Sequence, residues 1–438
     1  MRRIAIKFAV LLAVTLADDA AMAETVAVCP TGTGTGWLER TAPGGLVLHL
    51  EGSYYDMGVQ HGSLLREQVQ QAPTVLESFL KKKAPFLPVS WSVWLLDTLI
   101  FQRAEPYIPR EYLEEMRGIA DASGVSLRHI RAAHAIAYVS SCETAAAWGP
   151  ATLEGRLFFI RSNDDFAVPN PSSDTPFSDL RMVMVYKPNE ETPYALVNMP
   201  GMTGASDGMN SEGIAVGNMS LPSKSETAAG IPMQFRIKQT LAKSRSLAEA
   251  VEWMTKRPFE GGYNFLVADA KIPDARVIEM NAKKVYVGGW DGPAESNRYT
   301  FKGKTYSYQP AAGLLMRANH PLSSELLEDF TGRIEANGQN YQTGLRYADL
   351  RGRLMKLYGS LTLASMYGQL RESYFQMNYG SAATGGATTW QVAFDPLSGD
   401  FLLAISKGDP MIIGRPKASA FSQPYQSYNL FDLINSEP

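Results

Sequence analysis

Residues 140–149 read Ser-Ser-Cys-Glu-Thr-Ala-Ala-Ala-Trp-Gly, and residues 155–165 read Gly-Arg-Leu-Phe-Phe-Ile-Arg-Ser-Asn-Asp-Asp. The second segment is rich in aromatic and branched apolar residues, which is typical of a β-strand, and the first leads into it. Cys142 therefore stands at the start of a β unit that ends in Arg161 and Asp164. A cysteine in this setting is a candidate nucleophile.

The chain changes character at Cys142. Before it, the apolar spacing predicts helices over 54–80, 91–104 and from Pro109 to Gly124. After it, β-rich segments are expected at 157–160, 182–186, 195–198, 214–218, 265–268, 276–280, 314–317, 388–394 and 401–405, with helices near 232–243, 247–256 and 340–373. Runs of strands alternating with runs of helices predict an α+β architecture, in which helices cover layers of antiparallel sheet.

The first 23 residues have the pattern of a signal peptide. Arg2, Arg3 and Lys7 are followed by the apolar run 8–16, and Ala21-Met22-Ala23 fits a cleavage site. The apolar run is too short to span a bilayer, and no later segment reaches that length. We therefore expect an exported protein, periplasmic or secreted in a bacterium, without a transmembrane anchor. A signal anchor is the alternative.

The composition excludes some partners and cofactors. The 438 residues have a net charge of −3, which argues against a nucleic-acid-binding protein. The sequence has no basic stripe that could neutralise phosphates. Hydrophobic residues make up 45% and charged residues 19%, an ordinary globular balance. There is neither a Cys/His cluster with zinc spacing nor a known glycine-rich phosphate loop. We expect no metal and no organic cofactor.

The cysteine chemistry leaves three interpretations open. Cys29 and Cys142 are the only two cysteines, and an exported protein permits a disulfide between them. A nucleophilic Cys142 could instead pair with one of the five histidines, for example His134. In the third interpretation the chain is cut between Ser141 and Cys142. The freed α-amine, with an unperturbed pKa of about 8, then serves as the base for its own thiol.

Several blocks of sequence carry a family resemblance. Residues 142–149, 151–156 and 161–164 resemble the N-terminal-nucleophile (Ntn) hydrolases, and the acyl-coenzyme A:6-aminopenicillanic acid acyltransferase and carcinine hydrolase family is the nearest group. Bile salt hydrolase, penicillin V acylase and acid ceramidase are more distant relatives. Blocks at 52–62, 115–120, 207–214, 263–269 and 318–320 are also similar in sequence and in order. Together they span most of residues 50–400.

The resemblance implies a role for each matching residue. Cys142 matches the nucleophile, Arg161 orients the thiolate or the scissile carbonyl, Asp164 holds the α-amine, and Asn319 donates to the oxyanion. Further candidates are Asp165, as an alternative partner to Arg161, together with Asn210, Asn218 and His320; a turn role for Asn210 and a supporting role for His320 are the competing interpretations. Glu143 departs from the family pattern, because many relatives have Thr or Ser there.

The resemblance also implies the architecture and the reaction. We expect a four-layer αββα fold, with 24–141 as a helical pro-segment or small subunit and 142–438 as the catalytic domain or large subunit. The two fragments would stay associated after autoproteolysis. The expected activity is cleavage of a linear amide through a thioester on Cys142, with transfer of the acyl group to water or another amine. The alternatives are an uncleaved Cys–His hydrolase and an inactive scaffold that binds acylated ligands.

Overall fold

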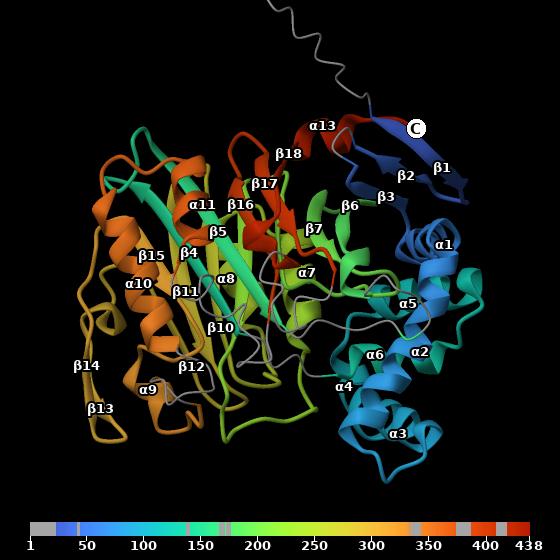
Figure 1. Cartoon of the computed structure of the whole chain (residues 1–438), viewed down its shortest axis with the longest axis horizontal. Helices are drawn as coiled ribbons and strands as arrows, with labels where there is room; N and C mark the ends of the chain where they lie inside the picture. The colour runs from blue at the N-terminus through green and yellow to red at the C-terminus, as the bar shows by residue number, and fades with distance from the viewer. Residues whose placement is uncertain are drawn as a thin grey trace, which may run out of the picture.

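A computed structural model describes residues 23–41, 44–136, 141–165, 171, 177–332, 334, 343–373, 387–408 and 418–438. Most of the expected signal peptide, residues 1–22, lies outside these ranges, and so does Ser140. Two large sheets form the body of the molecule (Figure 1). Among the described residues, no helix has the length and apolar character needed to cross a membrane.

The larger sheet has ten strands. In spatial order they are β1 (Glu24–Pro30), β2 (Thr35–Arg40), β3 (Leu46–Gly52), β6 (Met182–Pro188), β7 (Tyr194–Asn198), β8 (Asp207–Asn210), β9 (Ile214–Ser220), β10 (Tyr263–Asp269), β11 (Asp274–Met280) and β12 (Val285–Gly288). The pairing of β3 with β6 is parallel, and the other pairs in this sheet are antiparallel.

The smaller sheet has six strands, and all of its pairs are antiparallel. In spatial order they are β15 (Leu314–Arg317), β4 (Ser141–Gly149), β5 (Gly155–Asp165), β16 (Ala387–Asp395), β17 (Asp400–Ile405) and β18 (Gln426–Asn429). A separate hairpin joins β13 (Arg298–Phe301) to β14 (Lys304–Ser307).

Helices cover the outer faces of both sheets. Those before Cys142 are α1 (Tyr54–Leu64), α2 (Arg66–Lys83), α3 (Val89–Leu95), a π-helical turn (Leu96–Phe101), α4 (Gln102–Ala104), α5 (Arg110–Ser123) and α6 (Leu127–His134). The later ones are α7 (Met233–Lys243), α8 (Leu247–Thr255), α9 (Ser324–Leu327), α10 (Thr343–Lys356), α11 (Leu363–Arg371) and α13 (Leu430–Asn435). The helices α1 to α6 gather on the right of Figure 1, while α10 and α11 lie on the left.

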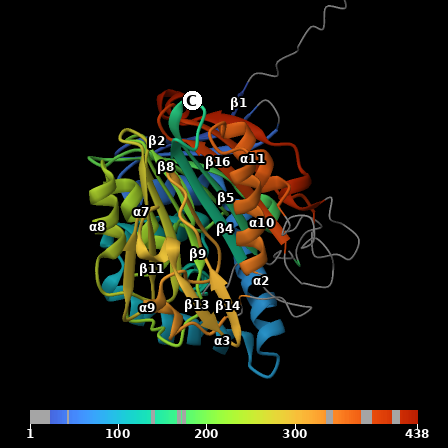
Figure 2. The same ribbon diagram turned by 90° about the vertical axis from the view of Figure 1, so that its left-hand side faces the viewer.

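Three buried apolar clusters define four layers. One lies between the two sheets and includes Phe159 of β5 and Ala215 of β9. A second lies between the ten-stranded sheet and helices α1, α5, α7 and α8. A third lies between the six-stranded sheet and helices α10 and α11. Figure 2 shows the order of the layers, from α7 and α8 through both sheets to α10 and α11. The predicted α+β class and αββα layering are confirmed.

The segment before Cys142 differs from the expected helical one, because its first part is β-structure. Strands β1, β2 and β3 extend the ten-stranded sheet. In β3, Val47 packs between the sheets, whereas Leu48 and Leu50 pack beneath the helices. A strand covered on both faces is apolar without a clean alternation, which is why its pattern is easily missed. The division at 141/142 stays a prediction.

Helices α1 and α5 pack unusually closely. A Cβ atom added at Gly58 would lie 2.2 Å from the carbonyl oxygen of Glu115, and one at Gly118 would lie 2.3 Å from that of Tyr55. Only glycine allows two helix backbones to approach to this distance. The contact fixes the part of α1 that carries His61 and the part of α5 that carries Glu115.

Candidate active site

Cys142 is fully buried on β4, and its side chain faces the space between the two sheets. The alternation along β4 shows this orientation: Ala146 packs between the sheets, while Ala145 and Ala147 pack against the helices behind them. In the β4–β5 register Cys142 lies opposite Asn163. Neither Cys142 nor Cys29 is in a disulfide, so the structure does not contain the bridge considered above.

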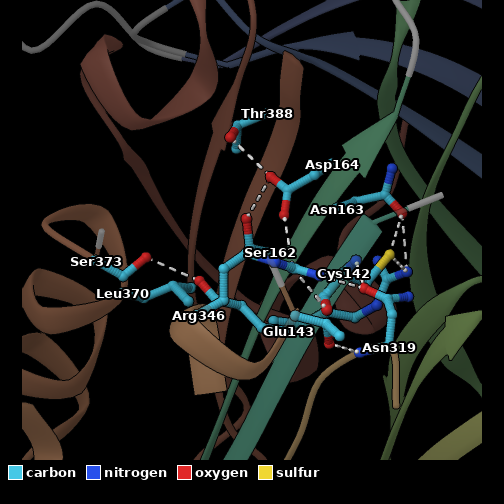
Figure 3. A network of polar contacts seen from close by, with 12 residues as sticks. Cys142, Glu143, Ser162, Asn163, Asp164, Asn319, Arg346, Leu370, Ser373 and Thr388 are labelled. Carbon is cyan, nitrogen blue, oxygen red and sulfur yellow. Dashed lines mark hydrogen bonds and ion pairs between the residues drawn. The ribbon is translucent and has the colours of Figure 1, made fainter. Parts of the chain in front are cut away.

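Arg161 of β5 lies directly beside the sulfur. Its Nη2 donates to Cys142 Sγ at 3.4 Å and also to Asn163 Oδ1 at 2.8 Å. The thiol in turn approaches Asn163 Oδ1 at 3.6 Å, a contact drawn in Figure 3. A fixed positive charge next to the sulfur stabilises the thiolate form, which is the nucleophilic form of cysteine.

The opposite sheet holds the Arg161 guanidinium in place. Nη1 forms an ion pair with Asp207 Oδ2 at 2.5 Å, and both side chains are fully buried. Asn218 accepts from the same guanidinium twice, through Oδ1 at 3.0 Å and through its backbone carbonyl at 3.1 Å. Burial raises the pKa of Asp207, and the charge of Arg161 opposes that shift. The guanidinium has little freedom to leave the sulfur.

Two other residues bind the backbone of Cys142. Its N–H donates to Asn319 Oδ1 at 2.8 Å, and its carbonyl oxygen accepts from Arg346 Nη1 at 3.0 Å. Arg346 also donates to Asn319 Oδ1, while Asn319 Nδ2 donates to the carbonyl of Ser220 at 2.7 Å. Asn319 therefore turns its oxygen toward Cys142, and its amide nitrogen is used by Ser220.

Asp164 lies on the other face of β5. Its Oδ1 accepts from Ser162 and from Thr388, and its Oδ2 lies 3.8 Å from Arg346 Nη1. These residues belong to the side that faces α10 and α11, away from the sulfur (Figure 3). Burial raises the pKa of Asp164 to about 8, although Arg346 opposes the shift. The structure brings Asp164 to the backbone of Ser141, its partner in the strand register, and not to the thiol.

The remaining candidates separate into two groups. Asn218 lies at the site, and His320 lies behind it, bonded to Thr343 and Tyr308. Asn210 lies elsewhere, since it donates to two carbonyls at the end of α7 and accepts from two amides of the β8–β9 turn. That geometry supports the turn interpretation of Asn210. The side chain of Asp165 lies outside the described residues.

The histidines have other partners than Cys142. Nδ1 of His134 bonds to the carbonyl of Ile130, and its Nε2 accepts from the backbone of Thr203. Both ring nitrogens of His320 are likewise engaged, by Thr343 and by Tyr308. The geometry therefore gives no support to the alternative in which His134 is the base for Cys142.

Sequence reasoning missed three residues that contact the site: Asn163, Asp207 and Arg346. Strand alternation contains the signal for Asn163, because residues two apart share a face and Asn163 is two from Arg161. No local pattern identifies the other two, which reach the site from β8 and α10. Asn264 is a positioning residue, since its Nδ2 donates to the carbonyls on either side of Asn319, those of Ala318 and His320.

A small cavity of about 40 Å³ adjoins the site. Asn163 and Asn218 line it on the side of the nucleophile. The rest of its wall is mainly apolar and includes Val197, Met199, Met202, Met233 and Trp390. Among the residues that the structure describes, no group of three or more His, Cys, Asp or Glu side chains could hold a metal ion.

Comparison with known proteins finds a family that part of the chain resembles. Residues 154–336 match the model of the family described as acyl-coenzyme A:6-aminopenicillanic acid acyl-transferase. This range contains Arg161, Asp164 and Asn319, while Cys142 precedes it.

Three individual proteins are similar to the chain. It is 24% identical over 262 residues to protein dcd1B of Dictyostelium discoideum. The aligned region covers 55% of this chain and 51% of that protein. It is 23% identical over 363 residues to an uncharacterized protein of Archaeoglobus fulgidus, covering 74% and 57%. The chain thus spans about half the length of these relatives. The N-acylethanolamine-hydrolyzing acid amidase ortholog of Caenorhabditis elegans aligns at 14% identity and a TM-score of 0.39, covering 66% of this chain and 100% of that one.

The sequence match agrees with the layered sheets and with the resemblance read from the sequence blocks. Over residues 154–336, this chain is similar to the acyl-coenzyme A:6-aminopenicillanic acid acyl-transferase family.

Proposed function

We propose that the protein is a cysteine amidohydrolase or acyltransferase that cleaves a linear amide through a thioester on Cys142. The observation that carries the proposal is the 3.4 Å contact between the Arg161 guanidinium and Cys142 Sγ, which is fixed by a buried ion pair with Asp207. A scarce, buried cysteine held against a permanent positive charge fits a nucleophile better than a structural thiol.

We further propose that the enzyme is activated by cleavage between Ser141 and Cys142. The thiol attacks the carbonyl of Ser141, the bond from that carbonyl to the nitrogen of Cys142 breaks, and the nitrogen takes the proton of the thiol. Water then hydrolyses the resulting thioester, which frees the carboxylate of Ser141 and the thiol of Cys142. The nitrogen of Cys142 then becomes an α-amine within reach of Asn319 Oδ1, which already accepts from it at 2.8 Å. Asp164, the register partner of Ser141, flanks the bond to be cut and becomes a second candidate to hold the amine.

In the reaction with substrate, the α-amine takes the proton of the thiol and the sulfur attacks the acyl carbonyl. The substrate amine leaves with that proton, and water or a second amine then attacks the thioester. Asn218 is a suitable oxyanion donor, because Arg161 holds its Oδ1 and the residue lines the cavity. For Asn319 to donate, as the resemblance implies, its amide must first leave Ser220.

Gel electrophoresis with N-terminal sequencing tests the activation step. We expect two fragments that copurify, with the second beginning at Cys142, and an uncut chain for Cys142→Ala. Penicillin V, N-acyl amino acids, conjugated bile acids and dipeptide-like amides are then assayed for release of the amine. An uncut wild-type chain with full amidase activity contradicts the free-amine mechanism. An uncut chain without activity that still binds acylated compounds favours the scaffold alternative.

We also propose that the protein is exported. The positively charged start, the apolar run and the Ala21-Met22-Ala23 site support this. Fractionation of bacterial cells expressing the full chain should place the protein in the periplasm or the medium, with a first residue near Glu24. A full-length chain that stays in the cytoplasm contradicts the proposal.

A further inference from the structure

Residues 199–204 make up most of the loop between β7 and β8, and they form one wall of the cavity that Asn163 and Asn218 line on the side of Cys142. Met199, Met202 and Gly204 line the cavity, and residues 200–204 are buried. A buried loop without strand pairing must find partners for its backbone N–H and C=O groups elsewhere, because each unpaired group is costly. The partners of this loop show which parts of the molecule hold it.

Two histidines from the segment before Cys142 supply partners for the loop. His61 of α1 accepts from the N–H of Gly201 through Nε2 at 2.9 Å. His134 of α6 accepts from the N–H of Thr203 through Nε2, also at 2.9 Å. Both histidines are buried, and Gly201 has a φ of 83°, a backbone conformation that favours glycine.

The segment after Cys142 holds the carbonyls of the same loop. Asn198 Nδ2 donates to the carbonyls of Met202 and Gly204, and Lys238 Nζ donates to that of Thr203 at 2.8 Å. Lys238 is itself paired with Glu115 of α5, and both side chains are fully buried. The loop is thus held from both sides of the expected cut, and two of its amides, those of Gly201 and Thr203, are held from the N-terminal side.

We propose that His61 and His134 are positioning residues that shape the acyl-binding wall of the cavity, so that the segment before residue 141 determines which acyl groups reach Cys142. The inference rests on the proposed function in assigning the cavity to the acyl group. Neither histidine touches the nucleophile, so their effect is on the fit of the substrate and not on the bond-breaking step.

The protonation state of the histidines suits this role. Burial lowers the pKa of His61 to about 3 and that of His134 to about 4, with the charge of Lys238 acting in the same direction. Both rings are therefore neutral near pH 7, and a neutral ring has one nitrogen able to accept a hydrogen bond. In His134 the carbonyl of Ile130 takes the N–H of Nδ1, which leaves Nε2 as the acceptor.

Hydrogen exchange of the loop tests the inference without any substrate. Peptides covering 199–204 should exchange at least tenfold faster in His61→Ala and His134→Ala than in the wild type. His61→Gln keeps an acceptor and should restore much of the protection. The matched control is His49→Ala, which removes another buried histidine of the same segment, one that contacts Glu39 and Trp37. It should leave the loop unchanged.

Alkylation of Cys142 tests the consequence for acyl recognition. We compare the rates with iodoacetamide and with N-octyl iodoacetamide, measured by mass spectrometry. In His61→Ala and His134→Ala the ratio of the two rates should change at least fivefold, while the iodoacetamide rate and the extent of chain cleavage stay within twofold of the wild type. His49→Ala should keep the wild-type ratio.

Three outcomes would overturn the inference: unchanged exchange of 199–204 in both alanine variants, an unchanged rate ratio, or an equal change in His49→Ala. Failure of the proposed function is a separate result. It appears as an uncut and inactive wild-type chain, and the exchange experiment still decides whether the two histidines hold the wall.

Discussion

The two faces of strand β5 at Cys142 carry different kinds of polar residue. The face between the sheets has Arg161 and Asn163, which contact the sulfur itself. The face toward α10 has Ser162, which donates to Asp164, and Asp164 itself, which reaches Arg346 and, through it, the backbone of Cys142. One face controls the nucleophilic atom, and the other holds the chain on either side of the bond expected to be cut.

This difference separates two functions that a linear motif combines. Arg161 and Asp164 are three residues apart, so strand alternation directs them to opposite faces. If the two faces of β5 have these separate functions, substitutions between the sheets should affect the thiolate and acyl transfer. Changes on the helix side should affect the backbone at Cys142 and the dependence on pH.

The largest effect should come from Asp207→Asn, which leaves the Arg161 guanidinium buried without a counter-charge. Removing one partner of a buried ion pair costs about 3–5 kcal/mol of the free energy of unfolding. Urea denaturation monitored by tryptophan fluorescence measures it. Glu212→Gln is the matched control, because it breaks the exposed pair with Lys271 and should cost less than about 1 kcal/mol. Equal losses in the two variants would show that the site does not depend on this pair.

The next effect is on catalysis between the sheets. Asn218→Ala should lower kcat about 10²–10³-fold by removing a donor to the oxyanion, with a smaller change in KM. Steady-state kinetics with an amide found in the screen measures this. Asn210→Ala is the control, because Asn210 lies at the β8–β9 turn and should affect stability but not kcat. A normal kcat in folded Asn218→Ala removes Asn218 from this role.

The third effect is a pH dependence on the helix side. Burial raises the pKa of Asp164 to about 8 from an unfolded value of about 3.9. The folded state therefore keeps a proton that the unfolded state loses. The contribution to stability is complete below about pH 4 and is lost as the pH rises through about 8. Asp164→Asn should flatten this part of the profile, measured as urea midpoints from pH 5 to pH 8.5. Parallel profiles for the two proteins would contradict the assigned pKa.

The sequence predicts the layers well, because apolar periodicity reports local structure directly. The strands around 182–186, 214–218 and 265–268 correspond to β6, β9 and β10, and the helices near 232–243 and 247–256 correspond to α7 and α8. The strands before residue 52 were missed. The apolar residues of β3 are covered on both faces, so this strand lacks the alternation on which the strand prediction depends. Strand β1 is mostly exposed and gives no buried apolar pattern either.

The site is only partly predictable for a different reason. Cys142 and Arg161 stand out because a scarce thiol precedes a strand that carries a cation. Asp207 and Arg346 reach the site from another sheet and from a helix, and these long-range contacts have no local signature. Asn210 and Asn218 look equally suitable in sequence. Only the fold distinguishes them, because Asn218 faces Arg161 of the six-stranded sheet and Asn210 bonds to the end of α7.

The pairing of β3 with β6 has a consequence for the reversibility of unfolding. Strands β1 to β3 belong to the same ten-stranded sheet as β6 to β12, so a cut after Ser141 would leave two polypeptides sharing one sheet and one core. The intact precursor would refold as a single molecule, at a rate independent of concentration. The cut protein would have to bring two chains together, in a second-order process. Cleavage would thus make the rate of refolding depend on protein concentration, which it would not do in the precursor.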